Sequence, residues 1–489
     1  MSHETYIGQK GYSIYKKSLS LKEQMFLREE LTVKPYMPKS PVQPAPYPIY
    51  RESNNKFYIP RFFGITVFGE PNENKIGQGI AINLTFSGAL RDNQTLIVNK
   101  YIEYVKKNKG GLLDLYTGFG KTVLALKIIE LIGLKTLIIV HKGFLVDQWI
   151  ERINQFLPDA RIGRIQGQII DIQDKDIVIG MLQSLSMKEY PDDQFSEFGL
   201  TIVDEVHHLS AEIFCRALQK AITTYTLGLS ATMNRKDGLS KVFKMFLGDI
   251  IHKEKREEAN SVLVKAIAFK ISDENFNQIE YDYRGNPKYS TMISKLCNFN
   301  IRSELIVYII TKELELNPNQ QIMILAHNKC LLIYLYKAIE YRKIASVGYY
   351  IGGMKQNDLK ISETKQIVIA TYSMASEGLD IKTLTTLILA TPKTDIEQAV
   401  GRIMRVKHQS PLIIDIIDSH DIFKKQWAKR KAFYQKNNYM ISYSDDYRGN
   451  KWSEITKKEK NKQNKQNKQN NQDDELDSIP MGKCLISIS

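Results

Sequence analysis

The chain has 489 residues, a hydrophobic content of 43% and a formal net charge of +14. That length exceeds one ordinary hydrophobic core, so two or three domains are expected. The basic excess favours a polyanionic partner, either nucleic acid or an anionic membrane surface, although charge alone does not exclude a merely soluble basic protein. No apolar run is long enough to span a bilayer, which predicts that the chain has no membrane span.

The start of the chain and the cysteines indicate a compartment. The first residues lack the basic-then-apolar pattern of a secretory signal peptide. The four cysteines are scattered, no two have the spacing of metal ligands, and a disulfide framework is not expected at this density. These features predict an intracellular, reducing compartment and no structural zinc.

Residues 1–85 are rich in Tyr, Pro and Lys, and we interpret them as an N-terminal accessory region. The stretch 34–48 predicts loop structure, because each proline removes a backbone donor and fixes φ. The apolar patch 81–86 is a candidate strand. This region is the least informative part of the globular chain, and binding of a protein partner is one candidate role for it.

Residues 86–250 alternate between apolar β-branched runs and helical segments. The strand-like runs are 112–115, 136–140, 176–180 and 200–204, and residues 123–132 have helical character. This alternation predicts a parallel α/β domain.

The same alternation returns over residues 301–445, with strand-like runs at 321–325, 366–370 and 386–389. Residues 251–300 are polar and charged without a clear period, and we interpret them as a connector with peripheral elements. The predicted fold class is therefore α/β, with two tandem parallel-sheet domains and a cleft between them.

The C-terminal segment 446–489 is a predicted tail whose low-complexity part begins at Lys457. Its Asn-, Lys- and Gln-rich sequence offers nothing to bury, so most of it is expected to be disordered. A solvated linker is the favoured interpretation, with weak tethering to nucleic acid as the alternative. The apolar last residues, 481–489, are candidates for docking on a partner or folding back.

A glycine-rich segment predicts a phosphate-binding loop: Thr117-Gly118-Phe119-Gly120-Lys121-Thr122. Gly118 and Gly120 let backbone N–H groups turn toward phosphate oxygens, and the following helix directs its positive N-terminal end at them. Lys121 supplies a charge for the β- and γ-phosphates, and the Thr122 hydroxyl suits Mg²⁺. The position that usually holds a glycine or alanine is Leu115, which weakens the match.

A second motif, Asp204-Glu205-Val206-His207, follows the apolar run 200–203. A carboxylate at the end of a buried strand can hold Mg²⁺, usually through water, which suits Asp204. Glu205 can orient or deprotonate the attacking water. An acidic turn after a strand is the common alternative, but it leaves the adjacent histidine and the phosphate loop unexplained. We expect His207 to couple this site to the neighbouring domain and His208 to be a bystander.

These motifs, with others in the same order, resemble superfamily 2 helicases and translocases over about residues 90–439. The other segments are Leu90-Arg91-Asp92-Asn93-Gln94, Ser230-Ala231-Thr232, Ala370 to Ile381 and Gln398 to Arg405, and Met233 stands where the family has Pro. The resemblance implies two RecA-like domains that use ATP and Mg²⁺. It implies that Gln94 reads the adenine, and that Arg91, Gly378 and Asp380 belong to the nucleotide site. It also implies that Ser230, Ala231 and Thr232 link hydrolysis to domain movement.

Two arginines in the last segment, Arg402 and Arg405, lie one helical turn apart and so share a helix face. An arginine facing a cleft can neutralise charge on a γ-phosphate during transfer. For an isolated pair, solvated arginines on an amphipathic helix would be the better interpretation. Because the other half of the chain carries a phosphate loop, we assign a catalytic role to Gln398, Arg402 and Arg405 together with Lys121, Asp204 and Glu205.

The family binds one nucleic-acid strand across both domains, mainly through its sugar-phosphate backbone. By resemblance, the contacts are Lys142, Gln183 and Ser184 in the first domain and Asn328, Thr371 and Ser373 in the second. Such contacts position a strand but carry little sequence information. Trp149, in the segment after Lys142, is interpreted as a core residue.

The branch of the superfamily is indicated by further segments. Residues 144–149, 181–185 and 230–238 resemble XPB- and UvsW-type DNA translocases, and residues 415–434 resemble helicases of large DNA viruses, including transcript-release helicases. DNA is therefore favoured over RNA as the partner of a protein expected to be a monomer. An RNA helicase and a non-enzymatic basic scaffold with a decayed ATP site are the alternatives. A viral protein would act in transcription or repair in the host cytoplasm or viral factory, with packaging in the virion as a further expectation.

Overall fold

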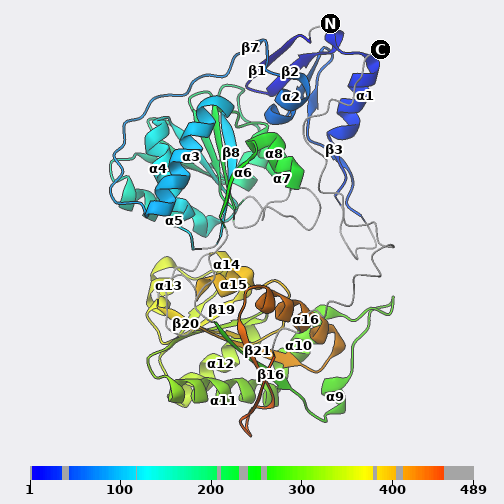
Figure 1. Cartoon of the computed structure of the whole chain (residues 1–489), viewed down its shortest axis with the longest axis vertical. Helices are drawn as coiled ribbons and strands as arrows, with labels where there is room; N and C mark the ends of the chain where they lie inside the picture. Colours follow the sequence, from blue (N-terminus) through cyan, green and yellow to red (C-terminus); the bar gives the residue numbers. More distant parts are fainter. Residues whose placement is uncertain are drawn as a thin grey trace, which may run out of the picture. The chain divides into compact units, whose positions relative to one another are not determined.

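The computed structural model describes residues 3–35, 43–116, 118–205, 211–230, 240–254, 262–377, 381, 383–403 and 411–455. The chain divides into two compact units, with the boundary after Lys255. Each unit contains one large sheet flanked by helices (Figure 1). No helix in the described part of the chain is long and apolar enough to cross a bilayer.

The first unit begins with a small sheet, so the accessory region is folded. Its strands are β1 (Thr5–Gly8), β2 (Gly11–Tyr15), β5 (Arg51–Glu52), β6 (Lys56–Ile59) and β7 (Glu73–Asn74), in the order β5-β6-β2-β1-β7. Helix α1 (Leu21–Glu30) starts with a capping box between Ser20 and Glu23. Strand β4 (Tyr47–Pro48) lies within the stretch predicted as a loop and pairs with β3 (Thr32–Val33).

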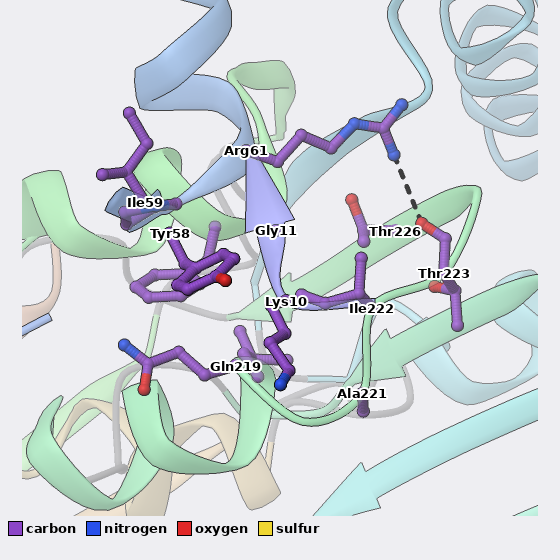
Figure 2. A pocket seen from close by; sticks show the side chains of 13 residues that line it. Lys10, Gly11, Tyr58, Ile59, Arg61, Gln219, Ala221, Ile222, Thr223 and Thr226 are labelled. Carbon is purple, nitrogen blue, oxygen red and sulfur yellow. Dashed lines mark hydrogen bonds between the residues drawn. The ribbon is translucent and has the colours of Figure 1, made fainter. Parts of the chain in front are cut away.

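The small sheet shares one hydrophobic core with two helices of the rest of the unit. Tyr12 and Phe57 of the sheet are buried in the same cluster as Phe214 of α7 (Ala211–Leu218) and Phe243 of α8 (Ser240–Leu247). Buried Arg61, at the start of α2 (Arg61–Phe68), donates from Nη1 to the carbonyls of residues 223 and 224 at 3.2 and 2.9 Å. Figure 2 shows the cavity at this junction and the hydrogen bond from Arg61 to the carbonyl of Thr223. The accessory region and the first α/β layer are therefore one packed body.

The large sheet of the first unit has the order β11-β10-β12-β9-β13-β14-β8-β15, and all neighbours are parallel except β10 with β11. Its strands are β8 (Gly110–Leu115), β9 (Thr136–Val140), β10 (Ile162–Gln166), β11 (Ile169–Asp171), β12 (Ile177–Met181), β13 (Leu200–Val203), β14 (Tyr225–Ser230) and β15 (Ile250–Glu254). Its helices are α3 (Asp92–Asn108), α4 (Lys121–Ile132), α5 (Gly143–Phe156) and α6 (Leu182–Met187), besides α7 and α8. These elements confirm the predicted parallel layer.

The large sheet of the second unit has the order β18-β19-β17-β20-β21-β16-β22-β23, parallel throughout except for β22 with β23. Its strands are β16 (Leu263–Phe269), β17 (Gln321–Ala326), β18 (Val347–Tyr350), β19 (Ile367–Thr371), β20 (Leu384–Leu389), β21 (Leu412–Asp418), β22 (Met440–Asp446) and β23 (Lys451–Glu454). Its helices are α9 (Glu274–Asn277), α10 (Tyr289–Asn298), α11 (Asn300–Leu316), α12 (Lys329–Tyr341), α13 (Gln356–Glu363), α14 (Tyr372–Glu377), α15 (Glu397–Arg402) and α16 (Asp421–Lys436). The predicted α/β class is confirmed for this unit too.

Three interpretations of the sequence are wrong. Residues 81–86 form no strand, since only Ala81 makes an isolated bridge, to Leu134. Residues 263–269 are not peripheral, because β16 lies between β21 and β22 in the sheet. Lys265 interrupts the apolar pattern of this strand, so the sequence did not indicate a buried strand here. The Lys265 ammonium lies 2.7 and 2.8 Å from the two oxygens of the buried Glu313 carboxylate. Residues 451–454 do not belong to a tail, because they pair with β22. The low-complexity residues from 456 onward lie outside the described part of the chain.

Candidate nucleotide site and nucleic-acid interface

The predicted phosphate loop lies between β8 and α4. Gly118 and Gly120 have φ values of 89° and 93°, a left-handed conformation that suits glycine. A Cβ on Gly120 would lie 2.5 Å from Nε2 of Gln94, so a side chain at this position would displace the Gln94 amide. Leu115, the departure from the usual motif, is the last residue of β8 and is completely buried. The departure therefore places an apolar side chain in the core and leaves the turn of the loop intact.

Two residues ahead of the loop hold it in place. Gln94 is buried and donates from Nε2 to the carbonyl of Phe119 at 2.8 Å. Nη2 of Arg91 donates to the same carbonyl. The Phe119 ring is itself buried and meets Tyr116 edge-on, with ring centroids 5.3 Å apart. In this structure Arg91 and Gln94 thus serve the backbone of the loop.

The phosphate loop and the acidic motif meet directly. Nζ of Lys121, in the first turn of α4, lies 2.8 Å from Oε1 of Glu205, and both side chains are largely shielded from solvent. Glu205 follows β13 with a φ of 52°, a left-handed conformation that is uncommon for a residue other than glycine. Such a backbone is costly and occurs often at functional sites. This backbone turn places the Glu205 carboxylate next to the Lys121 ammonium.

Asp204 is the buried carboxylate at the end of β13. Burial and the neighbouring charge of Glu205 raise its pKa to about 6, against the lowering effects of Lys121, Trp149 and His141. Nε1 of Trp149 donates to Oδ2 of Asp204 at 3.0 Å. Trp149 is 1% exposed, so its prediction as a core residue is confirmed, but its hydrogen bond to the acidic motif was missed.

Several predicted site residues cannot be placed. Thr117, His207, Ala231, Thr232, Gly378, Asp380 and Arg405 lie outside the described residues. The backbone of Arg402 ends helix α15, but its side chain is also outside the described part. Gln398 lies in the first turn of α15, and Ser230 is the buried last residue of β14. Thr122 is the second residue of α4, next to Lys121.

The predicted nucleic-acid contacts of the first unit lie together. Lys142 and Gln183 follow strands β9 and β12, which pair in parallel with Val140 opposite Met181. Nε2 of Gln183 donates to the carbonyl of His141 at 3.2 Å, and Ser184 accepts from the backbone N–H of residue 167 at 2.9 Å. Lys142 is also the N-cap of α5, the helix that carries Trp149.

The predicted contacts of the second unit follow strands β17 and β19, which pair in parallel with Ala326 opposite Thr371. Asn328 is the N-cap of α12, and its Nδ2 donates to Oγ of Ser294 at 3.1 Å. Thr371 is the last residue of β19 and Ser373 lies in the first turn of α14, with their hydroxyl oxygens 3.2 Å apart. Each unit thus presents its candidate contacts at the carboxyl ends of two neighbouring strands.

A cluster around residues 391–393, just before α15, was not foreseen from the sequence. Three consecutive carbonyls accept hydrogen bonds: that of Thr391 from Tyr372 (2.5 Å), that of Pro392 from Tyr289 (3.0 Å) and that of Lys393 from Arg430 (2.9 Å). Nδ1 of His327 is 2.8 Å from the Thr391 hydroxyl. Burial and the nearby Lys393 ammonium lower the pKa of His327 to about 4. The donors come from α14, α10 and α16, so three helices fix the segment that leads into the arginine helix.

Arg430 is itself held in a buried network. Its Nε and Nη2 each lie 2.8 Å from an oxygen of Asp415, and the Tyr434 hydroxyl donates to the same carboxylate at 2.9 Å. The resemblance to viral helicases included these residues without assigning them a role. The only signal in the sequence was a charged residue at helical spacing from aromatic ones, which does not identify a partner.

Two family models and several known proteins match this chain. A model described as "Type III restriction enzyme, res subunit" matches residues 87–235, and "Helicase conserved C-terminal domain" matches residues 303–407. The chain is 36% identical over 452 residues to "Putative ATP-dependent RNA helicase L396" of Acanthamoeba polyphaga mimivirus, covering 90% of this chain and 86% of that protein. It is 28% identical to "Putative helicase 161L" of Invertebrate iridescent virus 6, covering 79% and 90% of the two chains. The crystal structure of T4 UvsW aligns with 91% of this chain and 100% of that chain, at 18% identity and a TM-score of 0.36.

Two parallel-sheet units, a phosphate loop joined to an acidic motif and the two matched regions define an ATP-dependent helicase. More narrowly, the 36% sequence identity with the mimivirus protein over most of both chains shows that this chain belongs to the superfamily 2 helicases of large DNA viruses.

Proposed function

We propose that this helicase hydrolyses ATP between Lys121 and Glu205 and uses the energy to move along one strand of DNA. The 2.8 Å ion pair between these residues is the observation that carries the proposal. The Lys121 ammonium lies where it can exchange a carboxylate for a phosphate oxygen. Glu205, released by that exchange, accepts a proton from the attacking water.

Mg²⁺ fits the same site. Asp204 and the Thr122 hydroxyl offer oxygen donors, which Mg²⁺ prefers. A buried carboxylate whose anionic form is disfavoured by burial and by Glu205 would be stabilised by a divalent cation. When bound, Mg²⁺ supplies a positive charge that neutralises the β- and γ-phosphate oxygens during transfer.

The second unit completes the proposal. Gln398, Arg402 and Arg405 would act on the γ-phosphate, with Arg402 and Arg405 offsetting the charge that develops during transfer. Hydrolysis would then depend on the state of both units, as a motor requires. Lys142, Gln183 and Ser184 would hold the strand with Asn328, Thr371 and Ser373.

DNA is proposed as the strand because residues 144–149 and 181–185 resemble those of DNA translocases. RNA is the second candidate, favoured because the mimivirus relative is named an RNA helicase. ATP hydrolysis measured with single-stranded and duplex DNA and RNA of one sequence, at one salt concentration, separates them. DNA should give the larger stimulation at subsaturating concentrations. Stimulation of ATP hydrolysis by RNA alone would overturn the DNA assignment. Stimulation by neither nucleic acid would overturn the proposal that the protein is a motor.

A further inference from the structure

Helix α5 joins two parts of the first unit that the proposed mechanism treats separately. At its N-terminus lies Lys142, a candidate nucleic-acid contact, whose neighbour His141 accepts a hydrogen bond from Gln183. Two turns further along lies Trp149, which is 1% exposed and donates to Asp204. One rigid element therefore touches both the strand-binding segment and the carboxylate proposed to hold Mg²⁺.

We propose that Trp149 is a positioning residue that transmits nucleic-acid binding from the start of α5 to the Asp204 carboxylate. The inference rests on the proposed function, because it takes Asp204 as the magnesium-site carboxylate. It assigns the indole N–H a role that burial of an aromatic ring alone would not require.

The geometry restricts the carboxylate of Asp204. Its Oδ2 accepts the indole N–H at 3.0 Å, and its backbone N–H donates to the carbonyl of Ile139 at 3.1 Å. The second bond fixes the main chain, whereas the indole fixes the rotation of the carboxylate. A shift of α5 when nucleic acid binds would move the indole, because Trp149 shares one hydrophobic core with Leu145, Val146 and Ile153 of the same helix. The carboxylate would turn with it.

Removing a group that hydrogen-bonds to a metal ligand commonly weakens metal affinity by about 10- to 100-fold. Trp149→Phe keeps a large aromatic ring and removes the N–H donor. We expect the Mg²⁺ concentration for half-maximal hydrolysis to rise severalfold, and the stimulation of hydrolysis by single-stranded DNA to fall severalfold. The affinity for the same strand, measured by fluorescence anisotropy, should stay within twofold of that of the unmodified protein.

Ile153→Val is the matched control, since Ile153 is buried on the same helix, four residues away. It trims the packing of α5 without touching Asp204. Unchanged Mg²⁺ requirement and stimulation in Trp149→Phe would overturn the inference, and so would the same losses in both variants. If the unmodified protein showed no stimulation by any nucleic acid, the proposed function would fail instead, so the two failures are distinguishable.

A second measurement leaves Trp149 in place. The chain has three tryptophans, and Trp427→Phe with Trp452→Phe leaves Trp149 as the only one. Its emission should shift when single-stranded DNA is added in the absence of nucleotide, because the indole N–H would change its environment. Emission that does not respond to a saturating strand would contradict the proposal.

Discussion

Lys121 and Glu205 are 84 positions apart in the chain, yet their charged atoms lie 2.8 Å from each other. The left-handed backbone of Glu205 and the first turn of α4 bring them together. Each side chain thus neutralises the other in this structure.

The pair predicts different defects for its two members. Lys121→Ala removes the charge that attracts phosphate and leaves Glu205 to repel it, so ATP binding should be lost. Glu205→Gln removes the repulsion and the base, so ATP should still bind while turnover falls by about 10²–10⁴-fold. Equilibrium binding of a fluorescent ATP analogue, with steady-state hydrolysis, measures both. Lys127→Ala, on the same helix but paired with Glu130, is the control and should bind and hydrolyse normally. Equal binding by the two site variants would be inconsistent with this arrangement.

Gln94 predicts a defect in loop positioning. Gln94→Ala removes the hydrogen bond to the Phe119 carbonyl, and loss of one such bond is worth about 0.5–1.5 kcal/mol. The KM for ATP should rise about two- to tenfold, a range that follows from that free energy. Because the proposed phosphate loop would hold the phosphates of any nucleotide, the KM for GTP should rise by a similar factor. A rise for ATP alone would show that Gln94 acts on the base and not through the loop.

The segment 391–393 predicts that a buried hydroxyl in the second unit controls turnover. Tyr372→Phe removes the donor to the Thr391 carbonyl, so the segment that precedes α15 is held less firmly. The kcat should fall severalfold, with the KM for ATP little changed. Tyr101→Phe is the matched control, since that buried hydroxyl also donates to a backbone carbonyl, that of Thr226, away from both motifs. If the two variants lose stability equally and turnover equally, the segment has no special role.

His327 predicts a pH dependence of stability. Its pKa in the folded protein is about 4, below the ordinary value of 6.5, so the unfolded chain binds more protons between these values. The second unit should therefore lose stability as the pH falls from about 6.5 toward 4, because the buried imidazole must then accept a charge. Thermal unfolding across this range should show a shallower slope for His327→Gln. Parallel slopes for the two proteins would assign the effect to other groups.

The sheets could be predicted because their buried strands are continuous apolar runs, such as 136–140 and 367–371. The strand at 263–269 could not, since Lys265 interrupts its pattern and its partner Glu313 lies on another element. The patch 81–86 has the composition of a strand but makes only one bridge, which no local pattern reveals.

The candidate site followed the same division. Lys121, Asp204 and Glu205 were assigned from motifs, because their chemistry depends on residue type and short spacing. The contacts of Trp149, Tyr372 and Arg430 were not, because each hydrogen bond joins segments distant in sequence. An indole or a buried guanidinium has no signature that names its acceptor.

The most direct test is steady-state ATP hydrolysis by the whole protein, with and without single-stranded DNA or RNA, compared with Glu205→Gln. The account predicts hydrolysis that a nucleic acid stimulates in the unmodified protein and that is nearly abolished in the variant, with strand affinity retained. Hydrolysis indifferent to every nucleic acid, or undiminished in Glu205→Gln, would contradict it.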